Sequence, residues 1–220
     1  MNLDLFPLYL SLKVAVLATL MSFVIGIGIA WILARIEFSG KSMVAAIATL
    51  PLVLPPTVLG YYLLVAIGRQ SVVGRVLEET FGITLVFTWQ GAVIASTVVS
   101  IPLVIRSAQA AFEGVDPTLE NVARTLGRSE IAVFLTVTMP LAWKGILAGT
   151  TLAFTRALGE FGATLMVAGN IPGQTQTMPI AIYDAVQTGE MGLANLLVGV
   201  VTVVAIVALV LLERVAKVSV

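Results

Sequence analysis

Long hydrophobic runs alternate with short polar connections along this chain of 220 residues. Four runs contain no charged side chain, and they cover residues 14–34, 42–68, 80–105 and 191–212. A fifth apolar stretch, about 138–168, carries Lys144 near its start and Arg156 and Glu160 inside it. Because a transmembrane helix needs roughly 20 mostly apolar residues, each run is long enough to cross a bilayer. The pattern predicts an all-α membrane protein with about five transmembrane helices.

The first run is expected to be a retained span rather than a signal peptide. The residues before it include Asp4 but no basic cluster, and the run lacks an obvious small-x-small cleavage site. The outer connections are expected to be residues 69–85 and 169–190, and a long inner connection is expected at about 106–137.

Composition supports the same class of protein and excludes several others. Hydrophobic residues make up 59% of the chain and charged residues 11%, against roughly 25% charged in a soluble domain. The formal net charge is zero, which argues against nucleic acid as a partner. The chain has no histidine and no cysteine, which excludes disulfides, thiol catalysis and the usual zinc sites. We expect one transmembrane domain over residues 1–220, without a bound metal.

Basic residues in the connections predict the orientation in the membrane. One side collects Arg35, Lys41, Arg106, Arg124, Arg128, Arg214 and Lys217. The other side has Arg69 and Arg75, which Glu78 and Glu79 offset. Since cytoplasmic connections carry an excess of lysine and arginine, we expect the N-terminus outside and the C-terminus in the cytoplasm.

The inner connection has the pattern of two short helices that meet at a glycine. Asp116-Pro117 is a favourable helix start, and Gly127 is a natural stop. The first helix then has an apolar face made of Leu119, Val122, Ala123 and Leu126, and a polar side made of Glu120, Asn121, Arg124 and Arg128. Ser129 is expected to cap a second helix through Val137, and Pro140 to begin the next span. From the pattern alone the segment is either a plain amphipathic connector or a docking element.

This connection resembles the EAA loop of permease subunits of binding-protein-dependent ABC importers. The family pattern is Glu-Ala-Ala, three residues, Gly, nine residues, then Ile-x-Leu-Pro. The aligned residues here are Asn121-Val122-Ala123, Gly127 and Val137-Thr138-Met139-Pro140. Gly127 and Pro140 keep the family spacing, whereas Asn121 replaces the motif glutamate and Glu120 lies one position early. The resemblance implies an ATPase-docking loop over residues 113–137, with Glu120, Asn121, Val122, Ala123, Arg124, Gly127 and Pro140 as its candidate residues.

Several further segments in the same register resemble molybdate permeases. They are Leu50–Tyr61, Phe81–Thr84, Glu113–Asp116, Ala123–Gly127, Leu158–Thr164 and Asn170–Thr175. The resemblance implies a type I ABC importer permease of the cytoplasmic (inner) membrane, acting as a homodimer. It also implies two cytoplasmic ATPase subunits that hold ATP with Mg, and a molybdate-binding protein outside. Gly40-Lys41-Ser42 matches the end of a phosphate-binding loop, but that motif needs glycine at position 35, which is Arg35. The chain itself is therefore expected to bind no cofactor and to be no enzyme.

Polar groups inside the apolar runs are candidates for the translocation pathway. Arg156 and Glu160 lie one helical turn apart, and charges at membrane depth are expected to be paired or to face water. They form either an internal ion pair or part of a gate. Weaker candidates for the pathway are the hydroxyls of Thr57, Ser96 and Ser100.

Glycine and proline predict breaks and close contacts in the same runs. Gly159 and Gly162 flank Glu160, so the fifth span is expected to bend there. Pro51, Pro55 and Pro56 are expected to distort the second span. A stripe of small residues, Gly145, Gly149, Ala153 and Ala157, indicates close helix packing in lipid.

The outer segment 170–177 is polar and contains glycine and proline, and a short surface helix is expected at 179–188. It is either a plain connector or a contact for the outer binding protein, with Asn170, Gln174 and Thr175 as the candidate contacts.

Three alternative functions remain open. The first is an ABC permease for another oxyanion, such as sulfate, tungstate or phosphate. The second is an ion-coupled secondary transporter. The third is an intramembrane enzyme, although the residues offer no nucleophile and base set. A secondary transporter would need coupling carboxylates, and one acid inside five spans fits poorly.

Overall fold

The computed structural model describes residues 4–218, and these are helical with short connections. The helices are α1 (Phe6–Arg35), α2 (Lys41–Thr49), η1 (Leu50–Leu52), α3 (Pro56–Ile67), α4 (Val72–Phe81), α5 (Trp89–Glu113), α6 (Pro117–Thr125), α7 (Glu130–Val133), η2 (Phe134–Thr138), α8 (Met139–Leu158), α9 (Gly162–Ala168), α10 (Met178–Gln187) and α11 (Met191–Val218). No strand occurs within this described range, so the prediction of an all-α protein is confirmed.

Four helical segments are long and apolar enough to cross a membrane. They are α1, α5, the continuous stretch from Glu130 to Leu158, and the part of α11 up to Leu212. A fifth span results if the bent pair Lys41–Leu52 and Pro56–Ile67 is counted as one. The prediction of about five spans is therefore confirmed by length and composition, with one span broken.

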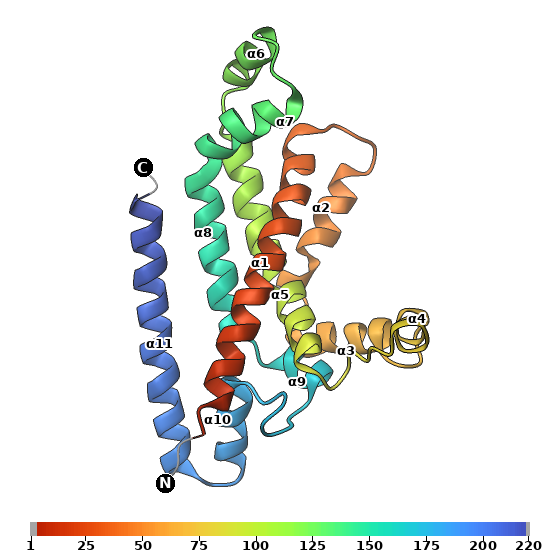
Figure 1. Ribbon diagram of the computed structural model, residues 1–220, viewed down its shortest axis with the longest axis vertical. Helices are drawn as coiled ribbons and strands as arrows, with labels where there is room; N and C mark the ends of the chain where they lie inside the picture. Colours follow the sequence, from red (N-terminus) through yellow and green to blue (C-terminus); the bar gives the residue numbers. More distant parts are fainter. Residues whose placement is uncertain (1–3, 219–220) are drawn as a thin grey trace.

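The second predicted span turns a corner instead of running straight. Its two helical pieces meet at 113°, and α3 projects sideways from the bundle (Figure 1). Pro51 lies in η1, Pro55 stands immediately before α3, and Pro56 is its first residue. Proline removes a backbone donor and clashes with the preceding turn, so the predicted distortion of this span is confirmed.

The third predicted span was placed too early in the chain. Residues 80–81 belong to α4, and α5 begins only at Trp89. Gly82, with φ +65°, ends α4, and the Thr88 hydroxyl caps α5 by accepting a hydrogen bond from the Gly91 N–H at 3.2 Å. Residues 69–85, expected to be a connection, contain the helix α4. Hydrophobicity alone does not reveal either boundary.

The fifth predicted span breaks where its glycines indicated. Helix α8 ends at Leu158 and α9 begins at Gly162, which confirms the predicted interruption. The beginning of this span differs from expectation, because α7 leads through the π-helical turn η2 into α8 without a gap, and Pro140 lies in the first turn of α8.

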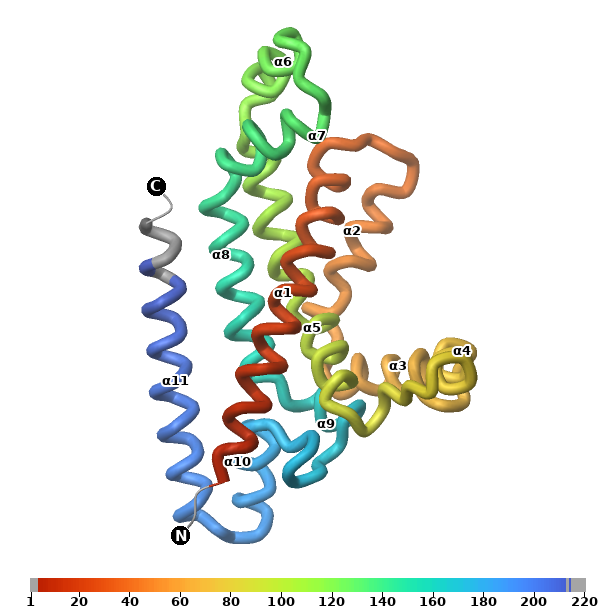
Figure 2. Tube along the Cα trace, viewed as in Figure 1, coloured from red at the N-terminus to blue at the C-terminus, as the bar shows by residue number. Residues whose placement is uncertain are grey.

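The core of the bundle is formed by α1, α5 and α8, which lie side by side in Figures 1 and 2. A Cβ atom on Gly149 would lie 2.5 Å from the Cβ of Ser107, and one on Gly145 would lie 2.5 Å from the Cβ of Ala111. Only glycine permits this approach of α8 to α5, so the predicted role of the small-residue stripe in helix packing is confirmed.

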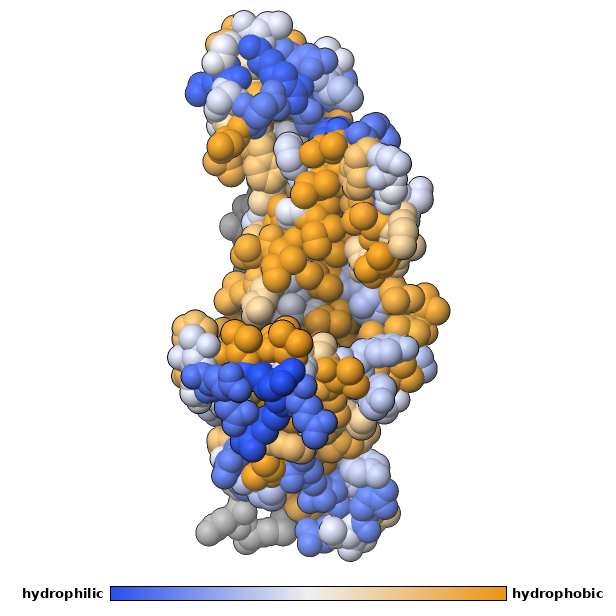
Figure 3. Space-filling model, turned by 90° about the vertical axis from the view of Figure 1, so that its right-hand side faces the viewer, coloured by the Kyte–Doolittle hydropathy of each residue, from blue (hydrophilic) through white to orange (hydrophobic). Residues whose placement is uncertain are grey.

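Surface hydropathy agrees with a membrane setting. In Figure 3 apolar residues cover much of the middle of the molecule, and hydrophilic residues gather at its ends and in one cluster in the lower half. Helix α11 runs along the outside of the molecule (Figure 2) and packs against α10 and α8. Few of its residues from Met191 to Leu212 are buried.

Candidate functional site

The helix pair α6–α7 forms one end of the molecule, beyond the ends of α1, α5 and α8 (Figure 1). The Asp116 carboxylate caps α6 by accepting a hydrogen bond from the Thr118 N–H at 2.8 Å, and these hydrogen bonds hold the pKa of Asp116 below its ordinary value. Gly127 follows α6 with φ +79°, a conformation that side chains disfavour. The Ser129 hydroxyl caps α7 by accepting from the Ala132 N–H at 3.3 Å. The predicted pair of short helices is confirmed.

Glu120 lies on the side of α6 opposite the apolar residues Leu119, Val122 and Leu126, as the pattern predicted, and this polar side faces the inside of the protein. Only 4% of the residue is exposed. Its Oε1 accepts hydrogen bonds from Arg35 Nη2 at 2.7 Å and from the Thr138 hydroxyl at 2.7 Å. The pattern did not indicate that this side is buried: α6 turns it towards the end of α1 and the beginning of α8, where the partly buried Arg35 is its partner.

A second set of polar contacts ties α6 to α7. Arg124 donates from Nε and Nη2 to the two oxygens of Glu130 at 2.7 and 3.1 Å, and from Nη1 to Asn121 Oδ1 at 2.8 Å. The Glu130 carboxylate raises the pKa of Arg124 above its ordinary value. Asn121, at the position of the motif glutamate, therefore serves within the loop as a partner of Arg124.

The opposite face of α6 is apolar and exposed. Leu126 is 78% exposed, and Leu119 and Val122 are about half exposed, whereas Ala123 is buried. A shallow groove of about 400 Å³ runs along this face and is lined by Leu119, Val122, Ala123, Leu126, Thr136, Val137, Pro140 and Leu141. The structure thus brings together Val122, Ala123 and Pro140 of the predicted docking residues and separates them from Glu120.

The intramembrane pair Arg156 and Glu160 forms a direct ion pair. Arg156 Nη1 lies 2.5 Å from Glu160 Oε2, and Glu160 Oε1 accepts from the Ala163 N–H at 2.7 Å. Glu160 is 2% exposed, while the Arg156 side chain is 33% exposed. The carboxylate therefore neutralises the arginine and caps α9 at the break, which agrees with the expectation of an internal ion pair.

The hydroxyls proposed for the pathway lie in different surroundings. Ser96 and Ser100 are buried in α5, where the Ser100 hydroxyl lies 3.0 Å from the Ser22 hydroxyl of α1. Thr57 is exposed at the start of α3. Among the described residues no hydrogen bond joins these three side chains to Arg156 or Glu160. The structure does not gather the five pathway candidates into one site.

The segment after α9, which was predicted to face outward, is an ordered turn. Asn170 donates to Asp184 Oδ1 at 3.1 Å and accepts from Gln176 at 2.9 Å. Thr175 is buried, and its hydroxyl accepts from the Ile171 N–H at 3.1 Å, so it stabilises the turn and presents no surface. Asn170 and Gln174 remain exposed. The predicted short helix is present as α10.

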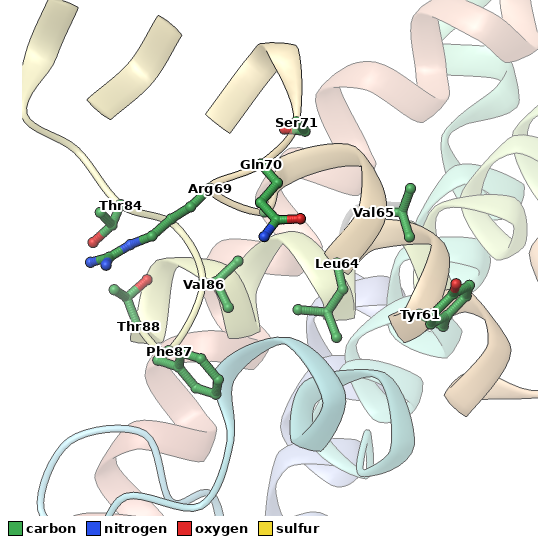
Figure 4. Close-up of a pocket in the computed structure, with 11 residues that line it drawn as sticks. Tyr61, Leu64, Val65, Arg69, Gln70, Ser71, Thr84, Val86, Phe87 and Thr88 are labelled. Carbon is green, nitrogen blue, oxygen red and sulfur yellow. The ribbon is translucent and has the colours of Figure 1, made fainter. Parts of the chain in front are cut away.

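One cavity was not indicated by the sequence. It measures about 770 Å³ and lies between α3, the residues before α4 and the connection 84–88. In Figure 4 the Arg69 side chain extends towards Thr84 and Thr88, and Tyr61 lies at the far side. Arg69 also lies 3.7 Å from Glu78, which is a weak and exposed ion pair.

Sequence reasoning missed the partners that hold the α6–α7 helix pair. Arg35 was read only as a positive-inside residue, and Thr138 and Glu130 were not singled out. Arg35 and Glu120 are 85 positions apart, so no local spacing reveals their contact.

Comparison with known proteins supplies relatives along most of the chain. The "Molybdenum transport system permease protein ModB" of Escherichia coli (strain K12) is 52% identical over 85% of this chain and 82% of the relative. The "Putative molybdenum transport system permease protein YvgM" of Bacillus subtilis (strain 168) is 46% identical over 86% of this chain and 83% of the relative.

Solved structures share the fold at low identity. The inward-facing MetNI methionine ABC transporter matches with a TM-score of 0.76 at 17% identity, over 97% of this chain and 94% of that one. A bacterial ABC transporter involved in the import of alginate matches with a TM-score of 0.80 at 16% identity, over 99% and 80%. The fold is that of type I ABC importer permeases, as the resemblance implied.

The family model described as "Binding-protein-dependent transport system inner membrane component" matches residues 22–217. With the long apolar helices and the α6–α7 end, this match identifies the chain as a multi-pass inner-membrane component. The chain belongs to the binding-protein-dependent transport system inner membrane component family.

Proposed function

We propose that this chain is the permease subunit of an ABC importer that carries molybdate across the cytoplasmic membrane. The observation that carries the proposal is the 52% identity, over most of both chains, to a permease named for molybdenum transport. The chain would act as a homodimer with two ATPase subunits, which hold ATP with Mg, and with an outer molybdate-binding protein. The nearest alternative solutes are tungstate and sulfate, which have the same charge and tetrahedral shape.

The α6–α7 end is the proposed contact with the ATPase. Its exposed apolar residues Leu119, Val122 and Leu126 line one side of a groove, and exposed apolar patches mark interaction sites. The basic residues Arg35, Arg106 and Arg128 belong to the same side of the chain, which supports a cytoplasmic position. The N-terminus then lies outside and the C-terminus inside.

Transport is proposed to follow alternating access. ATP binding would draw the two ATPase subunits together, and movement of α6 would switch the paired permeases between inward-open and outward-open forms.

Arg156 keeps a third of its side chain exposed while Glu160 balances its charge, which suits weak and transient attraction of an anion. Asn170 and Gln174 are the proposed contacts for the outer binding protein. Thr175 is no longer a candidate, because it is buried.

The deciding experiment is uptake of labelled molybdate into proteoliposomes that contain this chain, its ATPase and its binding protein. ATP-dependent uptake that resists excess sulfate supports the proposal as stated. ATP-dependent uptake that sulfate abolishes keeps the importer but changes its solute. Uptake by this chain alone, driven by an ion gradient, contradicts the importer function and favours the secondary transporter.

A further inference from the structure

Glu120 joins three separate parts of the chain through one carboxylate. Arg35, which donates to it at 2.7 Å, is the last residue of α1. Thr138, whose hydroxyl donates to the same oxygen at 2.7 Å, is the last residue of η2, directly before α8. Arg35 also donates to the Val115 carbonyl, just before α6, at 3.3 Å. The first turn of α6 is therefore attached to the ends of two membrane helices.

The attachment lies inside the protein and not on the surface that faces a partner. Glu120 is 4% exposed and turned away from the apolar groove of Leu119, Val122 and Leu126. A partner seated on that groove would contact these apolar side chains without reaching the carboxylate. Glu120 is thus an internal residue. The neighbouring position, where the EAA pattern has its glutamate, holds Asn121, which accepts a hydrogen bond from Arg124.

The surroundings make the carboxylate and Arg35 depend on each other. Arg35 Nε is buried and has no acceptor among the described residues. The guanidinium is held in place by the hydrogen bonds that its Nη2 donates to Glu120 and to the Val115 carbonyl. Charge-assisted hydrogen bonds of this length are the stronger kind. Loss of the negative charge would leave a partly buried guanidinium without its counter-ion.

Space for movement exists beside the pair. A cavity of about 230 Å³ is lined by Trp31, Arg35, Ile36, Glu120, Arg124, Glu130, Val133, Phe134 and Thr138. The second oxygen of Glu120 already lies 3.6 Å from Arg124. If the contact between Glu120 and Arg35 is lost, α6 therefore has room to shift relative to α1.

We propose that Glu120 is a positioning residue that transmits the movement of α6 to α1 and α8 through Arg35 and Thr138, and that it makes no contact with the ATPase. This inference rests on the proposed function of α6–α7 as the docking end. It gives α1 a direct part in coupling the movement of α6 to the membrane helices. Helix α8 is already connected to the α6–α7 pair, because α7 continues through η2 into α8.

The test compares Glu120→Gln with the matched control Glu37→Gln in the complete transporter. Glu37 lies two residues past α1, and its 88% exposed side chain forms only an exposed ion pair with Lys41. Three quantities are measured: co-purification of the ATPase, the rate of ATP hydrolysis, and molybdate uptake per ATP. For Glu120→Gln we expect normal co-purification and continued hydrolysis, with uptake per ATP reduced roughly tenfold, within the usual range of coupling energies. Glu37→Gln should match wild type.

Two outcomes overturn the inference. Loss of co-purification in Glu120→Gln would make Glu120 part of the docking surface, and unchanged uptake per ATP would remove it from the coupling path. A charge exchange, Arg35→Glu with Glu120→Arg, should recover at least part of the lost coupling, because it restores the pair in reverse. If the double variant shows no more uptake per ATP than either single variant, this result also contradicts the inference.

A measurement that needs no molybdate separates this inference from the proposed function. Because the chain has no cysteine, spin labels can be attached at Thr118→Cys on α6 and Phe38→Cys beyond α1. The distance between the labels should stay constant when ATP binds to the wild-type complex and should change in the Glu120→Gln background. If ATP binding changes the label distance equally in the wild type and in Glu120→Gln, the inference is overturned, whatever solute is carried.

Discussion

The two buried Arg–Glu pairs of this protein connect the chain in different ways. Arg156 and Glu160 are one helical turn apart, and their carboxylate also caps the short helix that follows. Arg35 and Glu120 come from distant parts of the chain and attach α6 to α1. Both glutamates are almost completely buried, at 2% and 4% exposure. The first pair stabilises one broken span, whereas the second joins elements that lie far apart in the sequence.

The largest expected effect comes from breaking the intramembrane pair. Glu160→Ala leaves Arg156 without a counter-ion and the Ala163 N–H without its acceptor. Removing one partner of a buried pair costs about 3–5 kcal/mol, and because a third of the Arg156 side chain is exposed, we expect a loss of stability at the lower end of this range. The thermal unfolding temperature in detergent measures this, with Glu160→Gln, which keeps an acceptor for Ala163, as the milder control. Equal unfolding temperatures for the two variants would contradict the capping role. Glu120→Gln should lower this temperature less than Glu160→Ala, which tests the comparison directly.

The next effect tests packing in the bundle. Gly149→Val would push its Cβ against the Cβ of Ser107, which lies 2.5 Å from the required position. Overpacking of this kind costs about 1–3 kcal/mol. The matched control is Gly199→Val, since no atom lies within 4 Å of a Cβ at Gly199. The same thermal measurement should separate the two variants, and an equal decrease in both would show that α8 and α5 can move apart without cost.

A smaller effect is expected at the turn between α6 and α7. Gly127→Ala places a side chain at φ +79°, and the left-handed conformation costs roughly 1–2 kcal/mol for an L-residue. Gly189 has the same φ of +79° in the connection between α10 and α11, and a Cβ there likewise meets nothing within 4 Å. Gly189→Ala therefore carries the same local strain elsewhere. Only Gly127→Ala should weaken co-purification of the ATPase, and equal binding by the two variants would argue against docking at α6–α7.

The smallest effect concerns the pH dependence of the α6 cap. The hydrogen bonds from Thr118 lower the pKa of Asp116 from its ordinary value of 3.8. The cap therefore stabilises α6 fully above that value, and its contribution is lost as the pH falls through the lowered pKa. Amide hydrogen exchange at the start of α6, corrected for the intrinsic rate, should show this loss of protection. In Asp116→Asn, which keeps the capping oxygen but does not titrate, the protection should not depend on pH over this range.

The parts that sequence predicted are those with local or compositional causes. Long apolar runs locate membrane helices because the bilayer demands them, and the breaks at Pro55–Pro56 and Gly159 follow from the backbone chemistry of proline and glycine. The caps Asp116 and Ser129 were predicted because each one bonds to backbone two or three residues later. The Arg156–Glu160 pair was predicted because helical spacing brings such residues together.

The contacts that could not be predicted depend on how distant elements meet. Nothing near Glu120 in the chain indicates Arg35 or Thr138, so its place on the polar side of α6 was predicted but its burial and its partners were not. Ser100 was considered for the pathway, yet its nearest hydroxyl is Ser22 on another helix. The late start of α5 arose from Gly82 and Thr88, which interrupt an apolar run without changing its hydrophobicity.

The corner between α2 and α3 has a consequence for the electric field across the membrane. The helical piece from Lys41 to Leu52 rises about 18 Å at 1.5 Å per residue, well short of a hydrocarbon layer of about 30 Å. Backbone groups freed at the corner need partners from protein or water, and water there would thin the insulating layer. The membrane potential would then fall over a shorter distance, at about 2.3 kcal/mol per charge for 100 mV. A charge that crossed the bilayer beside this corner would then meet most of that potential within the shorter layer.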